Sequence, residues 1–514
     1  VCTRSVFTCN GLEHGSLYKG GDWKVNGKKL YLVMIPVLLA AVCGSYLLYE
    51  GLGLKVYITQ IRWGAAAALF LCTAGTLLFC HRGKLSVEKG IALLVLAGCL
   101  LRILYMLETP VTQRGHDLFE LDSSAPGKAG YLLRILQEHR LPESYVLQLY
   151  QQPFFFLLGA GMSGILNGIL QRTDPFSLVD GAKVVSCLAS CFSLLAAERL
   201  LERLADGKDR IYGMLLLAFT PVFLYTGGRL GENALCLLFV VLALLYTLRF
   251  EEDPSFFHIF ILAVVYGCGM MTKISCAVPA LYTACVFGKK WKVEKQSRKS
   301  LTGKYVVFGI IAIPLGMWYS VRNLVLFGQS PWYVLRQSEE GGLYHGTESL
   351  AARFVIPDIK NIFVTPYADP YTDFNLPAYL MKSELFGEFR YQAPLWLPTI
   401  LLMLNVALSF GAAAYGIFLL INQKRENAGK NRILIWGLLF GLFAAWSYFR
   451  YPFGCTMDCR YYMMLPICKA MLLTLFLGRS AEGKYREELG IMQAGIRGCM
   501  VLFALTAILW FGMI

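Results

Sequence analysis

The sequence predicts an all-α membrane protein whose chain crosses the bilayer many times. Of its 514 residues, 56% are hydrophobic and only 16% are charged, whereas about a quarter of the residues in a soluble domain are charged. Apolar runs of about 17 to 20 residues, which are long enough to cross a hydrocarbon core, recur along the chain. This composition excludes soluble single-core enzymes, disordered chains, coiled coils and disulfide-stapled modules.

Thirteen apolar runs are the predicted spans. They cover residues 31–49, 64–80, 90–107, 178–198, 211–227, 233–249, 256–273, 275–288, 305–323, 395–422, 433–450, 462–478 and 498–513. A further apolar run at 153–171 is rich in glycine and begins at Pro153. Whether it crosses the membrane depends on the topology of the whole chain.

The positive charges predict that topology, because Lys and Arg in short loops stay on the cytoplasmic side. If residues 153–171 do not span and the N-terminal lysines lie inside, every basic cluster falls on one side. These clusters are Arg82 with Lys84, Arg199–Arg210, Lys289–Lys304, Lys424–Arg432 and Arg479–Arg497. We therefore expect 153–171 to be an interfacial or re-entrant element. The net charge of +14 then reflects cytosolic anchors, and no nucleic-acid partner is expected.

The same topology divides the chain into a cytosolic segment, residues 1–30, and a single membrane domain, residues 31–513. Residues 1–30 have no apolar signal-peptide region. Two long segments, 108–152 and 324–394, fall outside and are expected to carry interfacial helices. The first contains an amphipathic stretch with Leu132, Leu133, Leu136 and Leu141 on one face, which is typical of a helix lying on the bilayer.

An acidic group follows the third predicted span, at the membrane edge. It consists of His116, Asp117, Glu120 and Asp122. A carboxylate with a low-dielectric surface on one side and water on the other can have a raised pKa and accept a proton from a hydroxyl. The alternative is a set of solvated loop charges, since the spacing does not form a complete metal-ligand set.

Four cations lie near external span ends, outside the cytosolic clusters: Arg229, Lys273, Arg322 and Arg460. Each either extends toward the headgroups or lines a functional cavity. Together they run against the charge bias of the rest of the chain, and an anionic ligand would explain them. At an effective dielectric constant near 20, one charge pair at 4 Å is worth roughly 4 kcal/mol, so two or three could hold a phosphate.

Glu232 and Asn233 follow Arg229 at the start of a span. They either bind sugar hydroxyls or cap a helix. The sequence has no P-loop, dinucleotide fingerprint, HExxH or GxSxG motif, so ATP-driven transport and serine or zinc hydrolysis in their usual forms are disfavoured.

Several segments between about residues 105 and 470 together carry a family resemblance. They are GHDLFELD, HRLPES and LYQQPFFFLLGA, then GGRLGEN, MTKIS, WYSVRNLVLFGQSPW, KSELFGEF and CTMDCRYYMMLP. In this order the chain resembles the GT-C polytopic glycosyltransferases, the class of protein O-mannosyltransferases and aminoarabinose transferases. It departs from the pattern at Gln152, where proline is common. Glu232 and Asn233 occupy the acidic or amide positions that follow the arginine in this class.

The resemblance implies an inverting transfer from a polyprenyl-phosphate sugar donor to a hydroxyl of a glycan, lipid or protein, at the outer face of a bacterial plasma membrane. Asp117 would be the general base. Arg322 and Arg460 would bind the donor phosphate, with Lys273 or Arg229 assisting. His116, Glu120 and Asp122 are second choices for the base or would contact the acceptor. Glu232 and Asn233 would contact the substrate, and Asp458 would orient Arg460. No cofactor is certain, and a divalent metal ion is left open.

The alternative function is a transporter or flippase of lipid-linked saccharides, which would also place cations in a cavity. Inverted internal repeats would favour it, and the sequence shows none. Two long external segments suit an enzyme better.

Overall fold

The computed structural model describes residues 23–113, 118, 127–143, 149–205, 207–331, 333–334, 338–355, 362, 364–422, 428–479 and 486–514. Over these residues the regular structure is helical, and the only β-type pairing is an isolated bridge between Tyr344 and Phe453. The predicted all-α class is therefore confirmed.

The α-helices are α1 (Trp23–Gly51), α2 (Ile58–His81), α3 (Val87–Glu108), α4 (Gly127–Glu138), α5 (Phe154–Leu170), α6 (Pro175–Asp180), α7 (Lys183–Leu204), α8 (Arg210–Phe219), α9 (Pro221–Gly227), α10 (Asn233–Glu252), α11 (Phe256–Thr272), α12 (Ala280–Val293), α13 (Arg298–Phe327), α14 (Leu350–Phe354), α16 (Leu376–Phe386), α17 (Trp396–Ile421), α18 (Ala428–Arg450), α19 (Met464–Leu477) and α20 (Arg486–Met513). Short 3₁₀ helices are η1 (Leu54–Tyr57), η2 (Ile274–Ala277), η3 (Lys295–Ser297), η5 (Gly454–Met457) and η6 (Cys459–Tyr461).

Each of the predicted apolar runs overlaps a helix. Within the described part of the chain, nine helical stretches are long and apolar enough to cross a membrane, and the bent pair α8–α9 would make a tenth. Helices α5, α11 and α19 are apolar but shorter, at 17, 17 and 14 residues. The protein is thus built as a polytopic membrane protein, while the count of thirteen spans stays a prediction.

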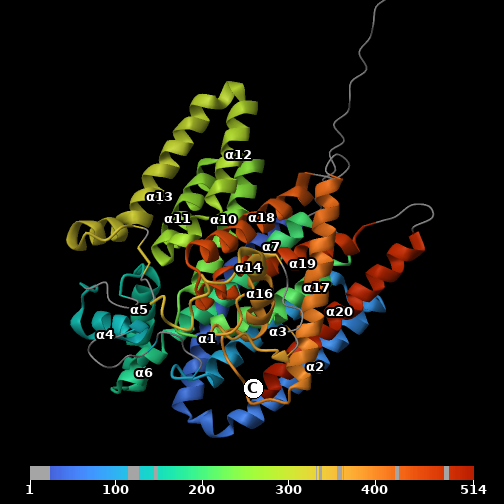
Figure 1. The fold of residues 1–514 in the computed structure, drawn as a ribbon, viewed down its shortest axis with the longest axis horizontal. Coiled ribbons are helices and arrows are strands. Elements are labelled where there is room, and N and C mark those ends of the chain that lie inside the picture. Colours follow the sequence, from blue (N-terminus) through green and yellow to red (C-terminus); the bar gives the residue numbers. More distant parts are fainter. Residues whose placement is uncertain are drawn as a thin grey trace, which may run out of the picture.

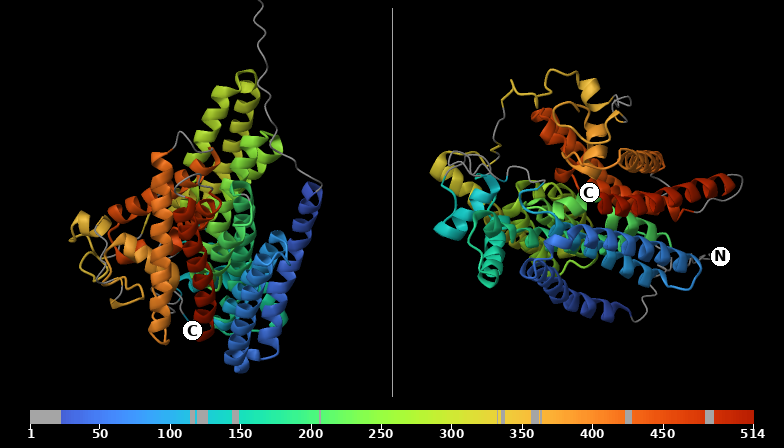
Figure 2. Two further views of the ribbon diagram at one scale, coloured as in Figure 1. Left: turned by 90° about the vertical axis from the view of Figure 1, so that its right-hand side faces the viewer. Right: turned by 90° about the horizontal axis from the view of Figure 1, so that it is seen from below.

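Helices from distant parts of the sequence pack side by side. The C-terminal helix α20 packs against both α2 and α17 (Figure 2). The α12–α13 hairpin projects at one end of the molecule (Figure 1). The other end of α13 reaches α4, where the hydroxyls of Tyr319 and Tyr131 lie 3.1 Å apart. Helix α16, from the second external segment, packs against α9, α17 and η6, so this segment is joined to the membrane domain.

The amphipathic helix of the first external segment is α4. Its Leu132 is fully buried, and its Tyr131 ring stacks on Phe156 of α5 with centroids 4.0 Å apart. Protein therefore covers much of the face that we expected to rest on the bilayer. Helix α4 ends at Glu138, so Leu141 lies beyond the helix.

One span is broken, and a buried arginine stabilises the break. Helices α8 and α9 meet at an angle of 41° at Pro221, which has no N–H to pair with the carbonyl of Leu217. Arg102 of α3 is 1% exposed and donates to that carbonyl (3.1 Å) and to the carbonyl of Ala218 (2.9 Å). The break lets the chain leave α9 at Gly227, just before Arg229.

Candidate functional site

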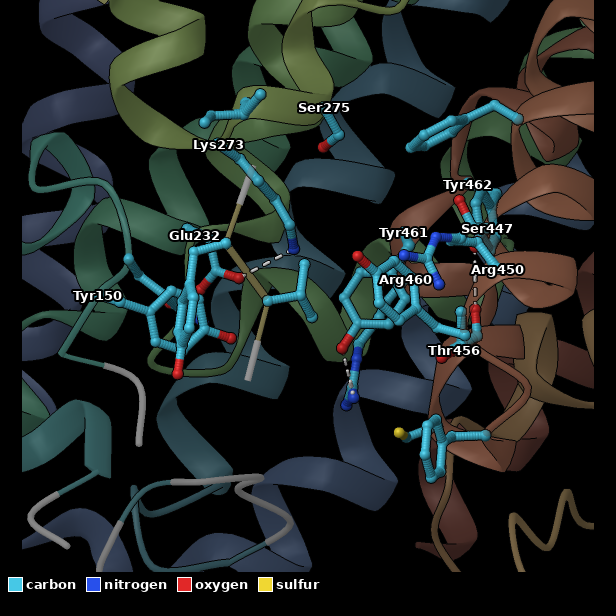
Figure 3. Close-up of a pocket in the computed structure, with 18 of the residues that line it drawn as sticks. Tyr150, Glu232, Lys273, Ser275, Ser447, Arg450, Thr456, Arg460, Tyr461 and Tyr462 are labelled. Atoms are coloured by element: carbon cyan, nitrogen blue, oxygen red, sulfur yellow. Dashed lines mark hydrogen bonds and ion pairs between the residues drawn. The ribbon is translucent and has the colours of Figure 1, made fainter. Parts of the chain in front are cut away.

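A cavity of about 1570 Å³ lies where the starts of α4 and α10, η2, the end of α13, the second external segment and the α18–α19 connection meet (Figure 3). Pockets for drug-sized ligands occupy about 300–1,000 Å³, so this cavity is larger than a typical pocket of that class. Its wall is mostly apolar. The charged residues of the lining are Lys128, Glu232, Lys273, Asp369, Glu388, Arg390, Arg450 and Arg460.

Glu232 is the residue before α10 and is 3% exposed. Its two carboxylate oxygens accept from Lys128 Nζ and Lys273 Nζ, each at 3.0 Å. Burial raises the pKa of Glu232, but the two lysines outweigh burial and hold the pKa below its ordinary value. The side chain makes no helix-capping hydrogen bond, so it serves the two lysines as an ionised carboxylate.

Lys273 ends α11 and connects two parts of the wall. Besides the bond to Glu232, its Nζ donates to Asn233 Oδ1 at 2.8 Å. The same atom lies 4.4 Å from the centroid of the Tyr461 ring. One ammonium group thereby links the start of α10, the start of η2 and the 3₁₀ helix η6.

Arg460 lies in η6 and is 7% exposed. Its Nη2 donates to Tyr461 Oη at 2.9 Å and lies 3.7 Å from Glu388 Oε2. Asp458, which the sequence predicts to orient Arg460, accepts from the Arg460 backbone N–H at 2.8 Å and lies 3.6 Å from Nε. Burial raises the pKa of Asp458 although Arg460 opposes this.

Arg229 does not line the main cavity. Its guanidinium lies over the rings of Tyr225 and Phe389, 4.6 and 4.2 Å from the centroids. Gly387 ends α16 with φ +59°, and a Cβ there would lie 3.2 Å from Arg229 Nη2. Glycine at this position therefore permits both the backbone turn and the close approach of Arg229.

Arg322 also points elsewhere. In the last turns of α13, its Nη1 donates to Asn323 Oδ1 and its Nη2 donates to the carbonyl of Pro142, both at 2.9 Å. It is not among the residues that line the cavity. The structure thus brings Glu232, Lys273, Arg460 and Asp458 into one cluster. Arg322 lies outside this cluster and binds the first external segment instead.

The predicted acidic group, His116, Asp117, Glu120 and Asp122, lies outside the described residues. Described backbone before this group, and at Leu118 within it, is hydrogen-bonded to other segments. Asp180 Oδ1 accepts from Val111 N at 3.0 Å, and the buried Leu118 accepts at its carbonyl from Ala129 N at 3.0 Å. Ala129 follows Lys128, so Leu118 is tied to the helix that delivers Lys128 to Glu232.

Lys128, Glu388 and Tyr461 belong to the cluster but were not predicted. Lys128 is a lysine in an external segment, the same exception to the charge bias that indicated Arg229, so the sequence contained a signal for it. Glu388 lies in KSELFGEF, a segment that carries the resemblance, but nothing in the sequence indicated its contact with Arg460. Among the described residues no group of three or more His, Cys, Asp or Glu is placed to hold a metal ion.

The chain shows similarity to known proteins in part of its length. Residues 178–318 match the family described as dolichyl-phosphate-mannose-protein mannosyltransferase. This stretch includes Arg229, Glu232, Asn233 and Lys273. No curated protein matches the chain significantly.

Two solved structures with overall similarity are those of an oligosaccharyltransferase from Archaeoglobus fulgidus. The apo form has a TM-score of 0.45 at 12% identity, covering 81% of this chain and 56% of that one. The complex with an inhibitory peptide and a dolichol-phosphate has a TM-score of 0.42 at 13% identity, with the same coverage. The chain therefore spans about half the length of these structures. The family match confirms, over residues 178–318, the predicted resemblance to the GT-C membrane glycosyltransferases.

Proposed function

We propose that this protein transfers a sugar from a polyprenyl-phosphate donor to an acceptor hydroxyl at the outer face of a bacterial plasma membrane, with inversion at the anomeric carbon. The observation that carries the proposal is the cavity of about 1570 Å³ whose wall places Lys273 and Arg460 against one tyrosine. The family match over residues 178–318, which contain Lys273, supports a lipid-phosphate sugar as donor.

Lys273 and Arg460 bind the donor phosphate in this proposal. An ammonium group has three N–H donors, and Lys273 uses two of them on Glu232 and Asn233, which leaves one for a phosphate oxygen. Charge-assisted hydrogen bonds of this kind are about twice as strong as neutral ones. Glu388 and Asp458 hold the guanidinium of Arg460 in place.

The reaction is a single displacement. The acceptor oxygen attacks the anomeric carbon on the face opposite the phosphate, and the bond between this carbon and the phosphate oxygen breaks. The bonding electrons leave with the polyprenyl phosphate, whose new charge Lys273 and Arg460 stabilise. The proton of the acceptor hydroxyl passes to the carboxylate of Asp117, the proposed base. His116, Glu120 and Asp122 are proposed for acceptor contacts.

Arg322 has a different role in the proposal from that of Lys273 and Arg460. Its bond to the Pro142 carbonyl supports a function in holding the first external segment against α13. Its predicted role in phosphate binding stays a prediction that a binding measurement can decide.

A transfer assay tests the proposed function. Detergent-purified protein is incubated with radiolabelled polyprenyl-phosphate hexoses and membrane extract, and the labelled product is identified. We expect a labelled glycoconjugate of inverted anomeric configuration from the native protein and loss of turnover, with donor binding retained, for Asp117→Asn. Near-normal turnover of folded Asp117→Asn would remove Asp117 as the base, and absence of product with every donor would overturn the transfer itself.

A further inference from the structure

A second, much smaller cavity of about 20 Å³ shares Lys128 and Arg460 with the main cavity. Thr226, Arg229 and Asn233 provide its other polar lining. Among the described residues, every charged residue in its lining is a cation and none carries a carboxylate. The main cavity, by contrast, has charges of both signs in its wall.

Arg229 is the cation of this small cavity with no carboxylate of the described residues at ion-pair distance, and Asp458 acts on it only from farther away. Lys128 is paired with Glu232 at 3.0 Å, and Arg460 has two carboxylates within 3.7 Å. Arg229 is 9% exposed, and its Nε and Nη2 have no hydrogen-bond partner. The aromatic rings of Tyr225 and Phe389 offset part of the cost of burying its charge. They provide no acceptor for its N–H groups.

The charge balance of the surrounding described residues leads to the same conclusion. The cluster and the adjacent Arg229 together contain four cations and three carboxylates, namely Lys128, Arg229, Lys273 and Arg460 against Glu232, Glu388 and Asp458. One positive charge is therefore left over. A buried charge without a partner is strongly unfavourable, so a bound anion would stabilise this arrangement.

The small cavity has room for an ion. A single water-sized particle needs about 10–15 Å³, so a cavity of about 20 Å³ accommodates a monatomic ion. The available donors suit such an ion. Asn233 Oδ1 already accepts from Lys273, which leaves the amide N–H₂ of Asn233 as a donor alongside Nε and Nη2 of Arg229.

We infer that this small cavity binds one chloride ion, held by Arg229. The ion neutralises Arg229 and so stabilises the turn between α9 and α10, which also carries Glu232. The inference goes beyond the proposed function and does not depend on it.

Thermal unfolding of the purified protein without donor tests the inference. The midpoint is measured in sodium chloride, sodium bromide and sodium gluconate at one constant ionic strength. A ligand that binds only the folded state raises the midpoint in a saturable way, and we expect a rise of about 2–4 °C in either halide over gluconate. Equal midpoints in chloride and gluconate would overturn the inference.

Two variants and a control assign the response to this site. Arg229→Gln is expected to lose the halide response. Asn233→Asp, which supplies a carboxylate inside the cavity, is expected to be as stable in gluconate as the native protein is in chloride, and to lose the response as well. Arg298→Gln, which removes a cation stacked on Trp291 in the α12–α13 hairpin, should keep the full response. A halide response that persists in Asn233→Asp would contradict the site.

Bromide provides a measurement that needs no variant. In crystals grown with sodium bromide, we expect an anomalous scattering peak within hydrogen-bonding reach of Arg229 Nε and Nη2. Density for a water molecule there, without anomalous signal, would overturn the inference. Because no donor is present in either experiment, failure here would leave the proposed transfer reaction untouched.

Discussion

Lys273 and Arg460, which lie far apart in the sequence, contact the same tyrosine. Lys273 Nζ lies 4.4 Å from the ring centroid of Tyr461, and Arg460 Nη2 donates to the Tyr461 hydroxyl at 2.9 Å. Tyr461 thus holds two cations beside each other at the wall of the main cavity. Without this tyrosine, the two cations would be positioned independently, because they come from separate segments. In the proposed function, a lipid phosphate meets two charged donors at once in this arrangement.

Replacing Tyr461 by phenylalanine keeps the ring beside Lys273 but removes the acceptor of Arg460. A hydrogen bond to a charged group contributes about 1.5–3 kcal/mol, and we expect at least a tenfold loss of donor affinity through the misplaced guanidinium. Isothermal titration with a polyprenyl-phosphate sugar measures this. Tyr305→Phe, which removes a hydroxyl bonded to the Phe287 carbonyl on the α12–α13 hairpin, is the matched control. Unchanged affinity in Tyr461→Phe would show that Arg460 does not depend on this contact.

Glu232 should make the stability of the protein sensitive to acid. Its folded-state pKa lies below its ordinary value of 4.5. At a pH between these two pKa values, the unfolded chain binds more protons than the folded chain, so the free energy of unfolding rises with pH. The contribution of Glu232 is complete above about pH 5 and is lost as the pH falls below 4.5. Glu232→Gln leaves Lys128 and Lys273 without their carboxylate and is expected to cost about 3 kcal/mol at neutral pH.

Unfolding midpoints between pH 3.5 and pH 7 test this prediction. The difference between native protein and Glu232→Gln should shrink as the pH falls. A difference that stays constant over this range would mean that Glu232 is not the acid-sensitive group.

Arg102 should stabilise the broken span without taking part in the reaction. Arg102→Met leaves the carbonyls of Leu217 and Ala218 buried without their donor, and each unsatisfied group costs about 1–3 kcal/mol. Denaturation in detergent should therefore show a loss of about 2–6 kcal/mol in the free energy of unfolding. Arg203→Met, which removes a half-exposed surface pair with Glu252, should cost less than about 1 kcal/mol. Similar losses in both variants would contradict the role of Arg102.

Arg322→Leu separates the two roles considered for this arginine. If Arg322 holds Pro142, the variant keeps donor affinity within about twofold, and amides of residues 139–143 exchange faster with deuterium because their anchor is gone. Donor titration and hydrogen exchange measure the two effects. A loss of donor affinity as large as that of Arg460→Gln would instead support the predicted role of Arg322 in binding the donor phosphate.

Much of the fold could be predicted because a membrane imposes strong constraints on sequence. Long apolar runs correspond to helices, and the cations that violated the charge bias led to Lys273 and Arg460 in the site. The stabilisation of the break at Pro221 by Arg102 could not be predicted, since a buried arginine within α3 has no local signature. Tertiary packing also decided that Arg322 binds a backbone carbonyl, whereas its position at a span end resembled that of Arg460. The contact of Glu388 with Arg460 could not be predicted either, because nothing in the sequence indicates that these two segments lie together.

The most direct test of the account is the affinity of the purified protein for a polyprenyl-phosphate sugar. Lys273→Met and Arg460→Gln are compared with the native protein and with Lys299→Met, an exposed lysine of the α12–α13 hairpin. We predict that each cavity variant binds the donor at least about tenfold more weakly, while Lys299→Met binds as the native protein does. Native affinity in both cavity variants, with folding intact, would show that these cations do not hold the donor phosphate.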